Sequence, residues 1–240
     1  AVVVLGVVAG TARASDDVLR TYRSRYVPGT YLSEREKVLD ELGATADRKA
    51  LDALTWCLDE TRKQIGAGLD AVEKAQKDLR PLQLELFEKE QKYLEQMRKQ
   101  GKTDVKVRPR WHIDEQVAEA RTVLLRAGLA LGEWRALVPT VKSRYSQVVA
   151  ALPPPELADV RDRWARGPLA SRDWAERALQ WELIGGVQDG WATDMLLDAA
   201  ASEADPRVLV HVLGGLSGRD AERVTPALSA ALADVLWLVR

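Results

Sequence analysis

The chain has 240 residues, of which 46% are apolar and 30% are charged. This balance is typical of a soluble globular protein and excludes disordered and collagen-like chains. Lys and Arg number 35 against 36 Asp and Glu, so the net charge gives no overall attraction for nucleic acid. We therefore expect a protein partner and no nucleic acid.

The chain begins with an apolar segment. Residues 1–10 carry no charge, and Ala12-Arg13-Ala14 follows them. Such a run before an A-x-A site is typical of a secretory signal peptide, and it is shorter than the about 20 residues that cross a bilayer. We predict that residues 1–14 are a signal-peptide remnant and that the protein is exported, to the periplasm, the envelope or the medium. A buried N-terminal strand is the alternative.

Residues 15–59 are predicted to form N-terminal helices and a first helix pair. Ser33 followed by Glu36 is a capping box, which predicts a helix that ends at Gly43. A second helix is expected from about Asp47. Its apolar stripe consists of Leu51, Leu54 and Leu58.

Residues 60–152 carry apolar side chains at seven-residue steps, which predicts a long antiparallel coiled-coil hairpin. The first arm has an apolar row of Ile65, Val72, Leu79, Leu86 and Tyr93, and a companion row of Leu69, Gln76, Gln83, Glu90 and Met97. The return arm has two apolar rows, Val117, Leu124, Leu131, Val138, Tyr145 and Leu152, and Ile113, Ala120, Ala127, Trp134, Val141 and Val148.

Two features of the arms qualify this pattern. Pro81 and Pro139 are expected to kink or interrupt them, because proline removes a backbone donor and clashes with the preceding turn. The polar residues of the companion row, Gln76, Gln83 and Glu90, have two interpretations. They either fix the register of the seam, which we favour, or belong to a face that binds another partner.

The segment from Gly101 through Pro109 is predicted to form the turn of the hairpin, and its surroundings are basic. The candidate contacts for an anion or a partner there are Lys102, Lys106, Arg108, Arg110 and Trp111. Such a patch would bind phosphates or an acidic membrane surface. A solvated tip without a ligand is the simpler interpretation, because charge runs commonly decorate exposed helix ends.

Residues 153–240 repeat one pattern. An apolar helix followed by Gly-Gly, then a second apolar helix, occurs at 177–201 and again 30 residues later at 207–233. Together with Val38 to Leu42, the segments Ala178 to Leu183 and Val208 to Leu213 resemble bacterial HEAT repeats. This resemblance implies a short α-solenoid with the hairpin inserted between its helix pairs.

The resemblance also implies a structural role for charged residues at the turns between repeats. In that family arginine and aspartate form a ladder there, which corresponds to Asp205, Arg207, Asp234 and Arg240 in this chain. A repeat stack needs polar caps at its ends, whereas this chain ends on an apolar segment. We therefore expect the protein to continue past Arg240 and residues 153–240 to be a truncated array.

No residue is nominated for catalysis, cofactor binding or metal binding. The two histidines, His112 and His211, are 99 positions apart, and the single Cys57 lies in an apolar stretch that predicts burial. The sequence contains no H-E-x-x-H, G-x-S-x-G or P-loop motif.

The sequence thus predicts an all-α, non-catalytic protein-interaction scaffold outside the cytoplasm, with no cofactor. The alternative is an enzyme that binds a small ligand or an anion at the basic tip. Some HEAT-like proteins resemble chromophore lyases, which keeps an enzyme among the hypotheses.

Overall fold

The structure is a computed structural model, and it describes residues 17–101 and 108–233. The described residues are helical, and no strand occurs among them. A first helix covers residues 17–25. The elements that follow are α2 (Leu32–Gly43), α3 (Arg48–Lys99), α4 (His112–Ala151), α5 (Pro154–Arg166), the 3-10 helix η1 (Pro168–Ala170), α6 (Trp174–Gly186), α7 (Gly190–Ser202), α8 (Pro206–Leu216) and α9 (Ala221–Ala233). The predicted all-α class is confirmed.

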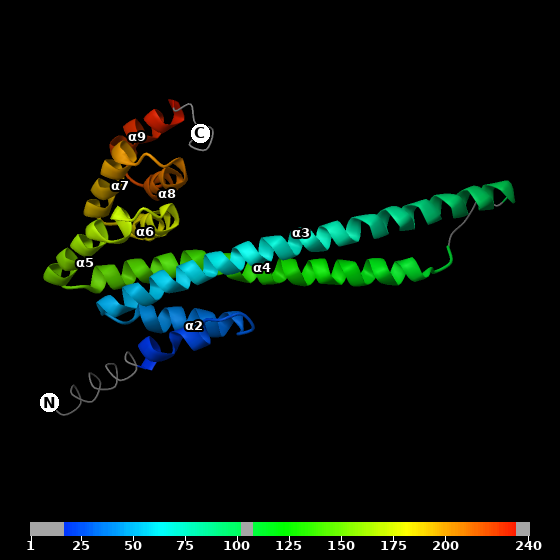
Figure 1. Ribbon diagram of the computed structural model, residues 1–240, viewed down its shortest axis with the longest axis horizontal. Helices are drawn as coiled ribbons and strands as arrows, with labels where there is room; N and C mark the ends of the chain where they lie inside the picture. Colours follow the sequence, from blue (N-terminus) through cyan, green and yellow to red (C-terminus); the bar gives the residue numbers. More distant parts are fainter. Residues whose placement is uncertain (1–16, 102–107, 234–240) are drawn as a thin grey trace. The chain divides into compact units, whose positions relative to one another are not determined.

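The chain forms two compact units (Figure 1). The body consists of the residues up to Thr61 together with those from Leu137 onward, and the hairpin unit runs from Arg62 to Ala136. Each of α3 and α4 lies partly in the body and partly in the hairpin unit. The hairpin unit is therefore shorter than the predicted span 60–152, because the last part of α4 packs into the body with Val141 and Tyr145 fully buried.

The N-terminal part of the body is built on the start of α3. The predicted stripe is confirmed, since Leu54 and Leu58 have no exposed surface. Tyr26 is also fully buried, and its hydroxyl lies 2.7 Å from the hydroxyl of Thr61. The predicted capping box is wrong, because the N-cap residue of α2 is Tyr31, two residues before Ser33, and it makes no side-chain cap.

The C-terminal part of the body contains two helix pairs, α6 with α7 and α8 with α9. Helix α8 packs on both α6 and α7. A Cβ atom added at Gly185 would lie 2.9 Å from the Cα atom of Gly215. The two helices therefore touch backbone to backbone, and they do so at equivalent positions of the two segments that the 30-residue step relates. Arg219 fixes this junction by donating to the carbonyl oxygens of Gly185 and Val187 at 3.2 and 2.6 Å.

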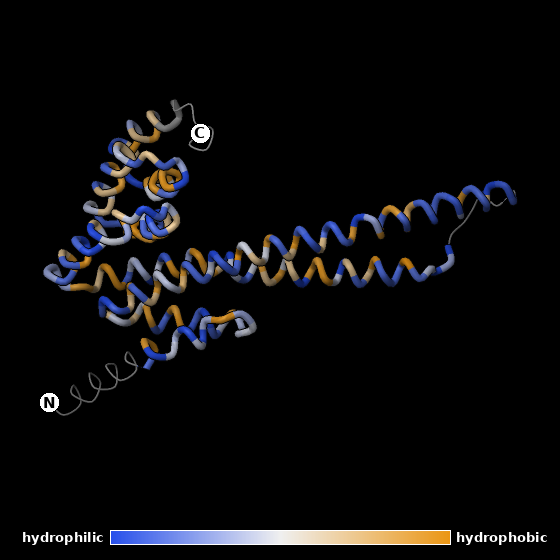
Figure 2. The backbone as a smooth tube through the Cα atoms, viewed as in Figure 1, coloured by the Kyte–Doolittle hydropathy of each residue, from blue (hydrophilic) through white to orange (hydrophobic). Residues whose placement is uncertain are grey.

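In the hairpin unit, α3 and α4 lie side by side and antiparallel (Figure 1). Both helices continue through their prolines, so Pro81 and Pro139 do not interrupt them as the sequence suggested. Both proline rings are exposed, where water can satisfy the carbonyl groups that lose their helical partner. Figure 2 shows short apolar stretches alternating with polar ones along both helices, as expected when only one stripe of each is buried.

The seam of the hairpin differs from the prediction on one of the two helices. Both apolar rows predicted on α4 are at least half-buried wherever they lie in this unit. On α3 the row through Leu79 is also confirmed, but its companion is wrong in its first part: Gln76 and Gln83 are exposed, and Leu69 retains 45% of its surface. Its last two members, Glu90 and Met97, are half-buried. The row that faces α4 instead lies one position earlier in the sequence. It consists of Gly68, Ala75 and Leu82.

The reason for this shift is the space that small residues provide. A Cβ atom added at Gly68 would lie 3.2 Å from the Cβ atom of Leu131, so the backbone of α3 approaches α4 closely there. Further along, Leu79, Ile113 and Val117 form the buried cluster of the hairpin. With Gly68 and Ala75 inside, the glutamine row falls outside the seam. Gln76 and Gln83 therefore do not fix the register.

Candidate functional site

Where α4 begins, a network of contacts around Arg108 connects it to α3. Its guanidinium donates to both carboxylate oxygens of Asp114, at 2.9 and 2.6 Å, and pairs with Glu90 at 2.7 Å. The same group lies over the ring of Trp111, 4.7 Å from its centroid, and Trp111 meets Tyr93 edge to face. Arg108 and Trp111 thus tie the start of α4 to α3.

Asp114 has a second role in this network. One of its oxygens accepts from the backbone N–H of Trp111 at 2.8 Å, which satisfies an otherwise free donor before the first turn of α4. The Arg108 guanidinium, with this backbone donor, holds the pKa of Asp114 well below its usual range. The carboxylate therefore stays charged at all physiological pH values.

These contacts reduce the positive charge that the tip can offer to an anion. Arg108 is balanced by Asp114 and Glu90, and Arg110 lies 3.6 Å from Glu115. The other two basic candidates, Lys102 and Lys106, lie outside the described residues. The geometry thus gives Arg108 and Trp111 a structural role in the hairpin.

The candidate turn residues of the repeats have local partners. Asp205 accepts from the backbone N–H of Arg207 at 3.0 Å and caps α8, and the Arg207 side chain pairs with the same carboxylate at 2.8 Å. Arg207 holds the pKa of Asp205 below its usual value. Its guanidinium also lies over the ring of Trp174, at the start of α6. Asp234 and Arg240 lie outside the described residues.

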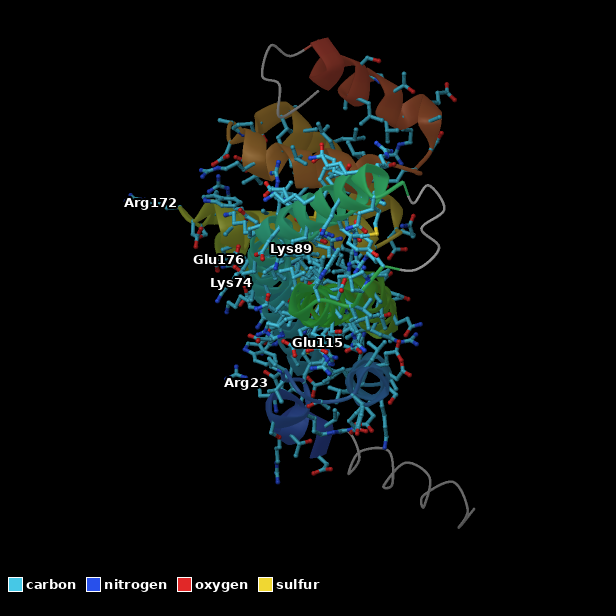
Figure 3. All side chains as sticks on the ribbon, turned by 90° about the vertical axis from the view of Figure 1, so that its right-hand side faces the viewer. Arg23, Lys74, Lys89, Glu115, Arg172 and Glu176 are labelled. Atoms are coloured by element: carbon cyan, nitrogen blue, oxygen red, sulfur yellow. The ribbon has the colours of Figure 1, made fainter. Side chains whose placement is uncertain are left out.

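Large apolar side chains are exposed mainly on the hairpin unit. Of the ten large apolar residues that are exposed in the described part of the chain, seven lie between Arg62 and Ala136. They are Leu69, Leu84, Phe87, Leu94, Val123, Leu125 and Leu129. Leu125 and Leu129 expose 63% and 62% of their surface, and Leu84 and Phe87 expose 58% and 57%. Charged side chains of the same unit, among them Lys74, Lys89 and Glu115, are labelled in Figure 3.

Several of these residues lie on one side of the hairpin, which we call the groove side. It carries a cleft of about 440 Å³, lined on α3 by Gln83 and Phe87 and on α4 by Ala118 and Arg121. Residues seven positions apart lie on the same side of a packed helix. The two rows therefore extend along α3 and α4 away from the cleft. They add Leu69, Gln76, Leu94, Leu125, Gly128 and Gly132. Leu129, one turn after Leu125 and next to Gly128, borders these rows and is counted with the groove side.

The α4 part of the groove side is both apolar and open. Gly128 and Gly132 are one turn apart, and a Cβ atom added at either would meet nothing within 4 Å. Leu125 and Leu129 lie beside them at helical spacings of three and four residues. The backbone of α4 is therefore accessible at these two glycines, next to two exposed leucines. Gly68 of α3 differs, because it is already in contact with Leu131.

Metal binding has no structural support in the part of the chain that the structure describes. Over residues 17–101 and 108–233, no three His, Cys, Asp or Glu side chains gather as they would around a metal ion. Cys57 is fully buried, as predicted, and burial raises the pKa of its thiol. Across the same residues, no helix has the length and apolar character that crossing a membrane requires.

Comparison with known proteins adds no relative, since no family model, no curated protein and no solved structure matches this chain. The sequence carries a signal for the groove side, since Gln76 and Gln83 allow a partner-binding face as the alternative to a seam. The favoured seam interpretation hides this signal, and Gly128 and Gly132 carry no side chain that would mark the surface.

Proposed function

We propose that this protein is a non-catalytic interaction scaffold outside the cytoplasm, and that its hairpin binds one amphipathic helix of a partner protein along the groove side. The observation that carries this proposal is the concentration of exposed large apolar side chains on the hairpin unit. Four of the seven, Leu69, Phe87, Leu94 and Leu125, lie in the groove-side rows, and an exposed apolar patch is typical of binding sites on soluble proteins.

A helix suits this surface because two packed helices offer a third one a ready groove. Gly128 and Gly132 allow a partner backbone to approach α4 closely. Leu125 and Leu129 would then insert between apolar residues spaced three and four apart on the partner. The expected partner segment therefore has a narrow stripe of small and apolar residues and polar residues elsewhere.

The body is proposed to be a short HEAT-like solenoid that carries the hairpin as an arm. Two observations support this part of the proposal. The contact of Gly185 with Gly215 relates α6 and α8 at a 30-residue step. Arg177 pairs with Glu203 at 3.1 Å and lies 3.9 Å from Asp205, which links α6 to the turn before α8. Export is supported by the apolar character of residues 1–10 and the A-x-A site that ends at Ala14.

Photo-crosslinking from defined positions tests the binding surface. A photoreactive phenylalanine analogue at Leu129 lies on the groove side, and the same residue at the exposed Glu119 is the control, because Glu119 lines a different cleft with Ala75 and Val123. Both proteins are expressed in the source cell, irradiated and analysed by mass spectrometry. We expect an adduct with a second protein from position 129, mapped to a helical segment, and no such adduct from position 119.

Three other outcomes contradict the proposal. An adduct only with another copy of this chain would make the groove side a self-assembly surface. Equal adducts from positions 129 and 119 would show non-specific exposure. No adduct from either position, with the protein folded and exported, would remove the docking role.

A further inference from the structure

The body contains a small cavity that the scaffold function does not use. It has a volume of about 240 Å³ and is enclosed by residues of α3, α4, α5 and α6. At about 30 Å³ for each water molecule, it would hold about eight waters or one small ring with a short tail. This is below the 300 Å³ or more of sites for drug-sized ligands, so a ligand would have to be small.

The inner wall of the cavity is aromatic and rigid. Tyr145 is fully buried and Trp164 exposes only 3% of its surface. Trp164 is stacked between Tyr145 and Trp191, at centroid distances of 6.1 and 6.2 Å, and Arg161 covers the far side of this stack by lying over Trp191. Because these rings support one another, the cavity does not depend on a ligand for its shape. Such a wall favours an aromatic ring as occupant.

A polar group in this wall lacks one partner. Gln180 exposes only 3% of its surface, and its Nε2 donates to the hydroxyl of Tyr145 at 3.1 Å. Its Oε1 accepts no hydrogen bond from the described residues. This oxygen is not sealed from solvent, so a donor on a ligand would take the place of a water molecule there. The cavity therefore favours a ligand whose inner end carries an O–H or N–H group.

The outer rim of the cavity favours a positively charged group on the ligand. Asp52 and Arg163 pair there at 3.1 Å and balance each other. Glu176, labelled in Figure 3, is exposed and has no ion-pair partner among the described residues. The remaining charge at the rim is thus negative. A cation on the ligand would find its counter-charge at Glu176.

We propose that this cavity binds a small aromatic amine that carries a hydroxyl or N–H group at the end of its ring. The ring packs against Trp164 and Leu179, the ring hydroxyl or N–H donates to Gln180 Oε1, and the ammonium group lies near Glu176 at the rim. This site lies wholly within the body. It is therefore independent of partner binding by the hairpin.

Three probe compounds separate the contributions of the ring hydroxyl and the ammonium group to binding. Tyramine has the ring hydroxyl and the ammonium, phenethylamine lacks the hydroxyl, and 4-ethylphenol lacks the ammonium. Binding to the whole chain is measured by ligand-observed NMR and calorimetry. A ligand of this size is expected to bind with a Kd of about 1 mM. Phenethylamine and 4-ethylphenol should each bind about five-fold to ten-fold more weakly than tyramine.

Variants of the protein show which residues cause the differences in affinity among the three probes. Gln180→Leu should abolish the preference for tyramine over phenethylamine, because both probes then meet an apolar wall. Glu176→Gln should weaken both amines and leave 4-ethylphenol unchanged, whereas the control Glu156→Gln, at an exposed carboxylate on α5 that does not line the cavity, should change nothing. Thermal unfolding of each variant confirms that it is folded.

The proposal is overturned if wild-type protein binds none of the three probes at 10-fold the expected Kd, which would leave a cavity filled only by water. It is also overturned if folded Gln180→Leu keeps the hydroxyl preference, or if Glu156→Gln weakens the amines as much as Glu176→Gln does. Should Gln180→Leu fail to fold, the comparison of the three probes on wild-type protein and Glu176→Gln still decides the matter.

Discussion

The body and the hairpin unit distribute their apolar residues in opposite ways. Of 38 buried apolar residues in the described part of the chain, only six lie in the hairpin unit, although it carries seven of the ten large apolar residues that are exposed. A helix in the body is covered by several neighbours, whereas each helix of a two-helix hairpin has only one. The difference indicates that the body supplies stability and that the hairpin offers surface.

The largest expected effect lies in the body. Leu58→Ala removes a fully buried side chain of α3 and should lower the free energy of unfolding by about 3 kcal/mol, because it leaves a cavity. Leu125→Ala, on the exposed face of α4, should change it by less than about 0.5 kcal/mol. Urea unfolding followed by circular dichroism measures both. A comparable loss from the two variants would contradict the division between body and hairpin.

The contact between α6 and α8 allows a matched pair of glycine substitutions. Gly215→Ala places a Cβ atom 2.9 Å from the Cα atom of Gly185 and should cost about 1–3 kcal/mol of the free energy of unfolding. Gly214→Ala, at the preceding position, meets nothing within 4 Å and should stabilise α8 by up to about 1 kcal/mol. Equal effects of the same sign would show that the backbone contact is not a constraint.

The two helices of the hairpin show which parts of the fold could be predicted from the sequence. The seam of α4 was predicted because both of its rows are apolar without a break. The seam of α3 was misplaced because Gly68 and Ala75 lack the size that marks a buried position, while Leu69, on the exposed side, has it. Helix α3 was expected to be kinked or interrupted at Pro81, and it is not interrupted, because an exposed proline can be tolerated within a long packed helix.

The cavity was beyond the reach of the sequence for another reason. Tyr145 and Gln180 are 35 positions apart, and Leu51 is further still, so no local spacing relates them. Only the packing of four helices brings them together. Tyr145 was correctly assigned to an apolar row of α4, but the row alone does not show which neighbour its hydroxyl meets.

In the hairpin unit, Asp114 allows a test by pH. Its folded-state pKa lies below the ordinary value of about 3.9, so its contribution to stability is complete above that value and is lost as the pH falls toward the folded-state pKa. The protection factors of the amides in the first turns of α4, which correct for the slower intrinsic exchange in acid, should therefore fall below about pH 4. Asp114→Asn should show this lower protection already at pH 7 and lose most of the acid dependence. An unchanged acid dependence in the variant would assign it to other carboxylates.

The smallest effect is expected at Cys57. Burial excludes solvent from the thiol and raises its pKa, so a disulfide reagent should not modify it in the native protein at pH 8. In urea the labelling should follow the unfolding of the body. Rapid labelling of the native protein would show that the start of α3 opens more readily than its burial indicates.

The central claim is that the groove side of the hairpin serves binding and not folding. The double variant Leu125→Gln, Leu129→Gln tests it most directly, with the unfolding free energy and the crosslinking yield from an adjacent groove-side position, Ala118, measured on the same protein. We expect an unfolding free energy within about 1 kcal/mol of wild type and at least a ten-fold lower yield of the partner adduct. A strongly destabilised protein, or an unchanged adduct yield, would contradict the claim.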